Sequence, residues 1–161
     1  MDAEKDARAE EAYRKAREYE LKYGSCPQCI LAAIQETVGG IDDATIKAAH
    51  GLAGGGGLAG AGTCGALTGG LLALSARHGR DRDKMDKGRY LNNFKKGKEL
   101  VERFRQEFGG VTCEELQKRF TGQCFDMWSA EGYSAFDKAR GTQCAEATGT
   151  DVTRRERWRR R

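Results

Sequence analysis

Proline and long apolar runs are almost absent from this chain of 161 residues. Pro27 is the only proline and β-branched runs are few, whereas alanine, leucine, glutamate, lysine and arginine are abundant. These abundant residues favour helices, so the composition argues against a sheet protein. A chain of this length is expected to form one domain.

The sequence also lacks the apolar segments that direct a protein to a membrane or out of the cell. No stretch approaches the ~18 consecutive apolar residues of a membrane-spanning helix, and the charged amino terminus lacks the apolar core of a secretory signal. We therefore expect a soluble, cytoplasmic protein without membrane partners. In that reducing compartment, six cysteines indicate metal ligands or redox thiols before structural disulfides.

The positive charge of the chain is concentrated at its carboxyl end. The net charge is +4, and residues 154–161 alone contribute +5 through six arginines and one glutamate. The rest of the chain is nearly neutral, so nucleic-acid binding is not expected. We assign residues 1–150 to a single helical domain and residues 151–161 to a solvated, arginine-rich tail.

Apolar periodicity, caps and glycine positions predict a bundle of about six or seven helices. The second helix follows Pro27, which suits a first helical turn, and Asp42 or Asp43 caps the third. The expected helices are 4–23, 27–38, 43–53, 64–78, 86–108 and one from a capping box at Thr112, followed by an irregular segment at 121–134, a short helix at 134–140 and a new helical start near Cys144.

The helix at about 64–78 is apolar on nearly all sides and follows a loop rich in glycine. Ten of the twenty residues from Gly51 to Gly70 are glycine. We expect this helix to be the buried centre of an all-α, single-domain bundle. Its small residues would let a neighbouring helix or a cofactor come close, and they favour a homodimer.

Four cysteines, Cys26, Cys64, Cys113 and Cys144, lie at or next to a predicted helix start. Helix N-termini offer N–H groups and the positive end of the helix dipole, which lower thiol pKa values and support an anionic site. Four thiolates are the ligand set of an iron–sulfur cluster or a tetrahedral zinc ion. Any one of them alone is more often a small buried apolar residue.

The remaining cysteines and one glycine motif leave alternatives open. Cys29 follows Cys26 by three residues, so this pair could share a metal or form a reversible disulfide. Cys124 falls in the irregular segment and has no assigned role. Glycines 60, 62 and 65 match G-x-G-x-x-G, but a helix precedes them instead of the strand that a dinucleotide-binding unit requires.

The cysteine pattern resembles that of the putative redox-active C_GCAxxG_C_C family over about residues 13–150. The segments that carry the resemblance are Cys26-Pro-Gln, Thr63-Cys64-Gly65-Ala66-Leu67-Thr68-Gly69, Thr112-Cys113-Glu-Glu-Leu and Cys144. The family is related to the helical domain of split-Soret cytochrome, so the resemblance implies an iron–sulfur cluster. Covalent haem is not implied, because Ile30 follows Cys29 and no CxxCH occurs.

We therefore expect a redox-active metal–thiolate protein, with an iron–sulfur cluster, that acts in electron transfer or redox sensing with an unknown partner protein. The predicted ligands are Cys26, Cys64, Cys113 and Cys144, with Cys29 as a substitute. The glycine loop is expected to border the cofactor and donate N–H groups to sulfur through Gly60, Gly62, Thr63 and Gly65.

Two other functions fit the same residues. A thiol–disulfide oxidoreductase would use Cys26 as its nucleophile and Cys29 as its resolving thiol. A structural zinc module would bind its ion through cysteines without redox activity, and its arginine-rich tail would recruit a partner.

Overall fold

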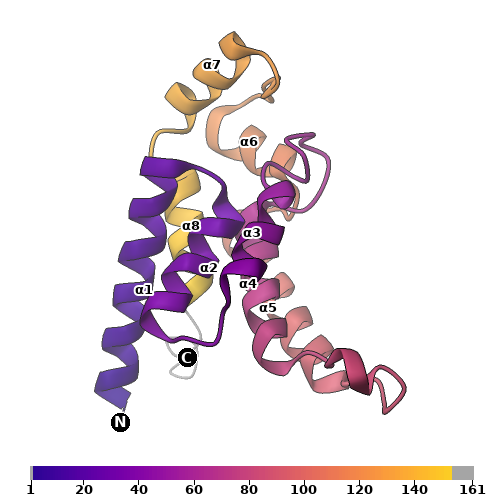
Figure 1. Ribbon diagram of the computed structural model, residues 1–161. Coiled ribbons are helices and arrows are strands. Elements are labelled where there is room, and N and C mark those ends of the chain that lie inside the picture. Colours follow the sequence, from indigo (N-terminus) through magenta and orange to yellow (C-terminus); the bar gives the residue numbers. More distant parts are fainter. Residues whose placement is uncertain (1, 154–161) are drawn as a thin grey trace.

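The computed structural model describes residues 2–153, and every regular element within them is helical, so the predicted all-α fold is confirmed. Figure 1 shows α1, α2 and α8 side by side, α4 and α5 beside them, and α6 and α7 at one end. Residues 154–161, most of the expected arginine-rich tail, lie outside the described residues. The helices are α1 (Asp2–Tyr23), α2 (Cys26–Thr37), α3 (Asp43–Ala48), α4 (Gly65–His78), α5 (Leu91–Phe108), α6 (Cys113–Thr121), α7 (Ala130–Arg140) and α8 (Gln143–Thr153), with 3₁₀ turns η1 (Ala49–Leu52) and η2 (Arg82–Lys84).

Small side chains let the first and last helices pack closely. Ala12 and Ala16 of α1 and Ala145 of α8 are at most 1% exposed. A Cβ added at Gly149 would lie 2.8 Å from Cδ2 of Tyr13, so the two helices touch there. The packing of these two helices holds α8, which carries Cys144, against α1.

The expected central helix is buried only over its first half. Gly65, Ala66 and Leu67 of α4 are buried, whereas Ser75 to Arg77 are exposed. The first half joins Ile30 of α2 and Phe104 of α5 in the main core cluster. The centre of the molecule is therefore shared by α2 and α4.

Three helix boundaries differ by more than two residues from the sequence-based prediction. The third helix ends at Ala48 and continues as η1, and α5 begins at Leu91 instead of 86, after Gly88 takes a φ of +133°. The α7 helix begins at Ala130 inside the segment expected to be irregular, because the Ser129 hydroxyl caps it by accepting the Gly132 N–H at 3.0 Å.

Among residues 2–153, no helix combines the length and the apolar character that crossing a membrane requires.

Candidate functional site

One small cavity gathers the side chains of four cysteines from four separate stretches of the chain. Cys26, Cys64, Cys113 and Cys144 all line it, and its volume of about 60 Å³ would admit a few water-sized groups. Leucine, methionine, tyrosine and phenylalanine side chains make up much of the remaining wall. The fold therefore brings together the four cysteines that the sequence singles out.

Each of these cysteines stands at the start of a helix, as predicted. Cys26 and Cys113 are the first residues of α2 and α6, and Cys64 is the N-cap of α4. Cys144 is the second residue of α8. Four helices thus begin around one cavity.

The glycine loop holds the start of α6 against the start of α4. The loop residues Gly54 to Gly57 all take positive φ, which favours glycine. The Gly62 carbonyl accepts the Cys113 N–H at 3.0 Å, and the Cys64 N–H donates to the Val111 carbonyl at 2.7 Å. These bonds flank an isolated antiparallel bridge between residues 63 and 112 and place Cys64 beside Cys113.

Two glycines of the central motif let α4 approach the start of α2. A Cβ at Gly65 would lie 2.7 Å from Cδ of Pro27 and 3.2 Å from Cβ of Cys26. A Cβ at Gly69 would lie 2.9 Å from Cα of Pro27. Without side chains at these two positions, α2 and α4 come close enough for Cys26 and Cys64 to reach one cavity.

The N–H groups of the loop glycines have other partners than sulfur. Gly60 and Gly62 donate to the carbonyls of Gly54 and Gly55, at 2.9 and 3.1 Å. Thr63 is exposed, so of the four predicted cofactor-binding residues only Gly65 lines the cavity. Gly60 and Gly62 hold the loop together through these bonds, and a cofactor contact of Gly60, Gly62 or Thr63 stays a prediction.

Burial affects the pKa values of the cavity thiols more strongly than their positions at helix ends do. Desolvation raises the pKa of all four cavity thiols, that of Cys144 to about 11. At Cys64 this rise in pKa is opposed by hydrogen bonds from the N–H groups of Ala66 and Leu67. The expected lowering of the thiol pKa values is wrong for the metal-free chain, because loss of hydration outweighs the helix-end effect.

Cys29 and Cys124 are not among the residues that line this cavity. Cys29 is 4% exposed, its Sγ donates to the Gly24 carbonyl at 2.9 Å, and burial raises its pKa strongly. A nucleophilic thiol needs a lowered pKa, but burial raises the pKa of Cys26, the predicted nucleophile, as well, so the geometry disfavours a Cys26–Cys29 redox pair. Cys124 is exposed, with its Sγ 3.7 Å from the Glu114 carbonyl oxygen.

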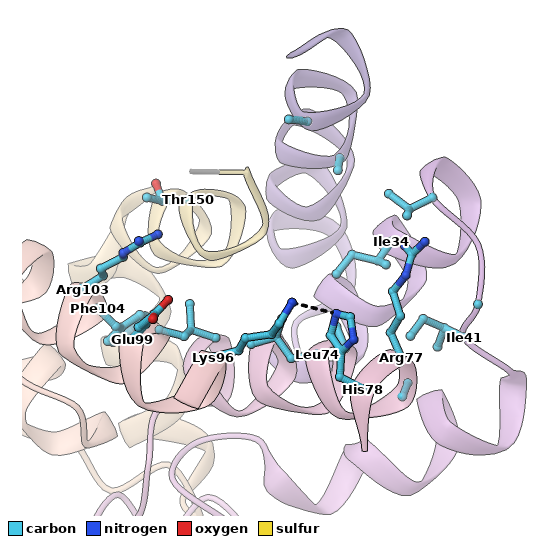
Figure 2. A pocket seen from close by; sticks show the side chains of 18 of the residues that line it. Ile34, Ile41, Leu74, Arg77, His78, Lys96, Glu99, Arg103, Phe104 and Thr150 are labelled. Atoms are coloured by element: carbon cyan, nitrogen blue, oxygen red, sulfur yellow. Dashed lines mark hydrogen bonds between the residues drawn. The ribbon is translucent and has the colours of Figure 1, made fainter. Parts of the chain in front are cut away.

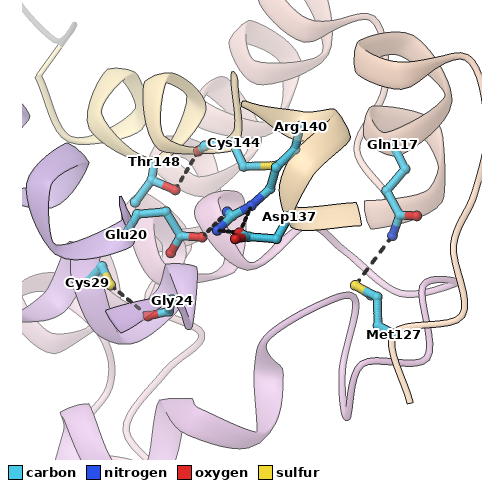
Figure 3. Close-up of polar contacts among 9 residues, drawn as sticks. All are labelled: Glu20, Gly24, Cys29, Gln117, Met127, Asp137, Arg140, Cys144 and Thr148. Atoms are coloured by element: carbon cyan, nitrogen blue, oxygen red, sulfur yellow. Dashed lines mark hydrogen bonds and ion pairs between the residues drawn. The ribbon is translucent and has the colours of Figure 1, made fainter. Parts of the chain in front are cut away.

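A buried ion pair that the sequence analysis missed borders the thiols. Arg140 of α7 donates to Glu20 of α1 at 2.8 Å, the two side chains are 7% and 3% exposed, and both line the cavity (Figure 3). Arg140 also pairs with Asp137 at 2.7 Å. One signal for Glu20 existed, since it follows Ala12 and Ala16 at four-residue spacing on the buried side of α1.

Two buried oxygens beside the thiols lack a hydrogen-bond partner within residues 2–153: Oε2 of Glu20 and Oγ of Ser25. Both residues line the cavity. Burial raises the pKa of Glu20, while the charge of Arg140 and its hydrogen bond to Glu20 lower it. Because buried polar groups are normally satisfied, the donor set and these orphan oxygens fit a cavity that takes up a polar or charged group.

Gln117 of α6 makes a direct contact with one thiol. Its Nε2 donates to Sγ of Cys113 at 3.4 Å and lies 3.6 Å from Sδ of Met127, a contact drawn in Figure 3. Its Oε1 accepts the Phe125 N–H at 2.9 Å, which fixes the orientation of the amide. Gln117 is 2% exposed, so this amide is held beside the sulfur by the fold.

The thiols surround a space instead of converging on a point. Across the part of the chain that the structure describes, no three or more His, Cys, Asp or Glu side chains are grouped as a single metal ion would require. A tetrahedral zinc site holds its sulfurs about 2.3 Å from one atom. The zinc module, like the iron–sulfur cluster, stays a prediction.

Comparison with known proteins identifies one family. The profile described as "Putative redox-active protein (C_GCAxxG_C_C)" matches residues 24–156. No match to the chain is found among curated proteins or among solved structures. The family match covers all four cavity cysteines.

Proposed function

Since this chain belongs to the putative redox-active C_GCAxxG_C_C family, we propose that its four cavity cysteines hold an iron–sulfur cluster that serves in electron transfer or redox sensing. The observation that carries this proposal is the convergence of Cys26, Cys64, Cys113 and Cys144 on one cavity. Such a cluster would supply one-electron chemistry, which none of the side chains here performs alone.

A cluster suits this cavity better than a single ion does. Iron–sulfur clusters are held by four cysteine thiolates that bind more than one iron atom between them, so the ligands are spread around the group. The four thiols here line a space of about 60 Å³ and are not gathered around one atom. The orphan oxygens of Glu20 and Ser25 lie on the same cavity.

The chain's own residues would control charge at this site. Four thiolates carry negative charge into a buried space, and Arg140 places a guanidinium on the cavity wall. Gln117 donates a hydrogen bond to Cys113, and the first turn of α4 donates two to Cys64. Such contacts stabilise thiolate charge and set the reduction potential of a cluster.

The test is elemental analysis of protein purified without oxygen. We expect brown protein with visible absorption and with iron and sulfide in stoichiometric amounts. Cys64→Ala should abolish the visible absorption and the bound iron and sulfide. Cys124→Ala, the matched control at an exposed cysteine, should leave the absorption and the iron and sulfide content unchanged. Colourless protein with one tightly bound zinc, or metal-free protein that turns over disulfides through Cys26, would replace the proposal by one of its alternatives.

A further inference from the structure

A second and much larger cavity is a groove lined by α1, α2, α4, α5, the loop after α2 and, through Thr150, α8. Its volume of about 880 Å³ lies within the range of small-molecule sites. In Figure 2 the groove lies between α1 above and the paired helices α4 and α5 below. None of its lining residues is one of the four cavity cysteines, so this groove is separate from the thiol site.

The floor of this groove is mainly aliphatic. Ile34, Val38 and Ile41 line it from one side, and Leu74 and Leu100 from α4 and α5. Alanine and glycine occupy many of the other floor positions, which leaves the volume open. An extended apolar chain would bury its surface against the aliphatic side chains along such a floor.

The rim of the groove is positively charged. It holds five lysine and arginine side chains against two glutamates, Glu99 and Glu107, although the main body of the chain is nearly neutral. Lys96 and Arg103 of α5 are partly buried and extend into the groove, and Nζ of Lys96 lies 3.3 Å from Nε2 of His78 (Figure 2). Cations that are partly desolvated beside apolar surface favour an anionic partner.

We propose that this groove binds an acyl carboxylate, with the aliphatic chain along the floor and the carboxylate at Lys96 and Arg103. The charge of the rim selects this occupant over the chain's own residues 154–161, whose net charge is +5. It also disfavours a neutral chain, which would bring no negative charge to the five lysine and arginine side chains of the rim. The proposal does not depend on the iron–sulfur assignment, because the thiol cavity contributes nothing to the groove.

The experiment is isothermal titration calorimetry of the full chain with decanoate. Saturable binding at one molecule per chain is expected, with 1-decanol, which lacks the charge, bound at least about tenfold more weakly, because one charged hydrogen bond is worth about 1.5–3 kcal/mol. The double variant Lys96→Gln/Arg103→Gln should bind decanoate more weakly than the unaltered protein by a similar factor. Lys98→Gln, an exposed cation on the same helix outside the groove, is the control and should bind normally.

A second variant tests the floor without touching the charges. Ala76 is exposed and lines the groove, so Ala76→Trp should fill it and abolish decanoate binding while the helix content stays unchanged. Equal binding of decanol and decanoate would overturn the proposal. So would binding that appears only after residues 154–161 are deleted, or a dimer in sedimentation that excludes decanoate, because another occupant would then fill the groove.

Discussion

At the scale of single residues, the site depends on what surrounds each sulfur. Burial raises the pKa of the four cavity thiols, so in the metal-free chain they are protonated at neutral pH and binding a metal must release protons. The neighbours that favour thiolate charge are few: the amide of Gln117, the guanidinium of Arg140 and the first N–H groups of α4. Each of these can be removed separately.

Gln117→Leu is expected to lower the reduction potential of the loaded protein. The substitution removes the hydrogen bond to Cys113, which stabilises the more negative, reduced state. A hydrogen bond worth about 1 kcal/mol corresponds to roughly 40 mV at 59 mV per tenfold change for one electron. Optical redox titration measures the shift, with Lys118→Leu, exposed on the same helix, as the control. An unchanged or higher potential would show that the Gln117 amide does not act on the cluster.

Some residues of the site could be predicted from the sequence, and others could not. The four cysteines could be grouped because each follows a recognisable helix-start signal, such as the capping box from Thr112 to Glu115. Arg140 carried no such signal, because an arginine in the last turn of a helix is ordinarily a solvated cation. Its burial accompanies a long-range ion pair with Glu20 of α1, a contact that no local pattern encodes.

At the scale of helices, close approach of α4 to α2 is the feature that assembles the site. Gly65 and Gly69 sit one turn apart and face Pro27, so the spacing of the central motif reflects one helix–helix contact. The sequence alone predicts that these glycines leave space for a cofactor or a neighbouring helix. The structure assigns the space mainly to α2.

Gly69→Ala is expected to destabilise the protein by about 1–3 kcal/mol, as overpacking of a core does. The new Cβ would lie 2.9 Å from Cα of Pro27 and 3.2 Å from Cβ of Ile30, neither of which can easily move away. Urea unfolding of the metal-free chain measures the loss. Gly51→Ala is the control, because nothing lies within 4 Å of its added Cβ and its φ is not positive. A Gly69→Ala midpoint equal to that of the control would contradict the close contact.

The Glu20–Arg140 pair is expected to couple α1 to α7. Arg140→Met leaves a buried carboxylate without its cation and should cost about 3–5 kcal/mol in the free energy of unfolding. The double variant Glu20→Leu/Arg140→Met removes both charges and should recover a large part of that loss. Urea denaturation of the three proteins makes the comparison. A double variant less stable than Arg140→Met alone would show that the unpaired carboxylate of Glu20 is not the source of the loss in stability.

The sequence predicts that these helices exist better than it predicts the residues at which two of them begin. The long helix was expected from 86 because apolar spacing begins near there, but Gly88 and the positive φ of Tyr90 delay it to Leu91. The start of α7 was missed because Ser129 is a cap that precedes no obvious apolar stripe. Caps decide boundaries, and apolar periodicity alone does not reveal them.

At the scale of the whole molecule, the two ends of the described chain are joined by a polar contact. Glu146 of α8 accepts a hydrogen bond from the Tyr13 hydroxyl and pairs with Arg17 of α1 at 2.6 Å. The Tyr13 hydrogen bond, followed by that of Arg17, lowers the pKa of Glu146 below its ordinary value of about 4.5. The contact therefore supports the packing of the last helix, which carries Cys144, against the first.

Acid should weaken this contact. Because the folded-state pKa of Glu146 is lowered, its contribution to stability is fully present above about 4.5 and is lost as the pH falls through the folded value. Glu146→Gln is thus expected to lower the urea midpoint at pH 7 and to show a smaller decline towards pH 3 than the unaltered protein. Glu102→Gln, which alters an exposed pair with Lys98, serves as the control. Parallel pH profiles for Glu146→Gln and the unaltered protein would argue against the contact.

The fold class could be predicted from the sequence, but the arrangement of the helices could not. Composition and periodicity were enough for an all-α fold, whereas burial of only half of α4 could not be foreseen. Its second half is apolar in sequence, yet it forms a wall of the groove between α1 and α5. Apolar character tells that a surface needs a partner, but not whether that partner is the chain itself.

The central claim is that four cysteines, and no others, form one site. The direct measurement is the iron and sulfide content per chain of the double variant Cys29→Ala/Cys124→Ala, purified without oxygen. The account predicts the content and absorption of the unaltered protein, and their loss when Cys26, Cys113 or Cys144 is then changed to alanine in the same background. A double variant that fails to load although it is folded, or one that still loads after any of these further changes, would contradict it.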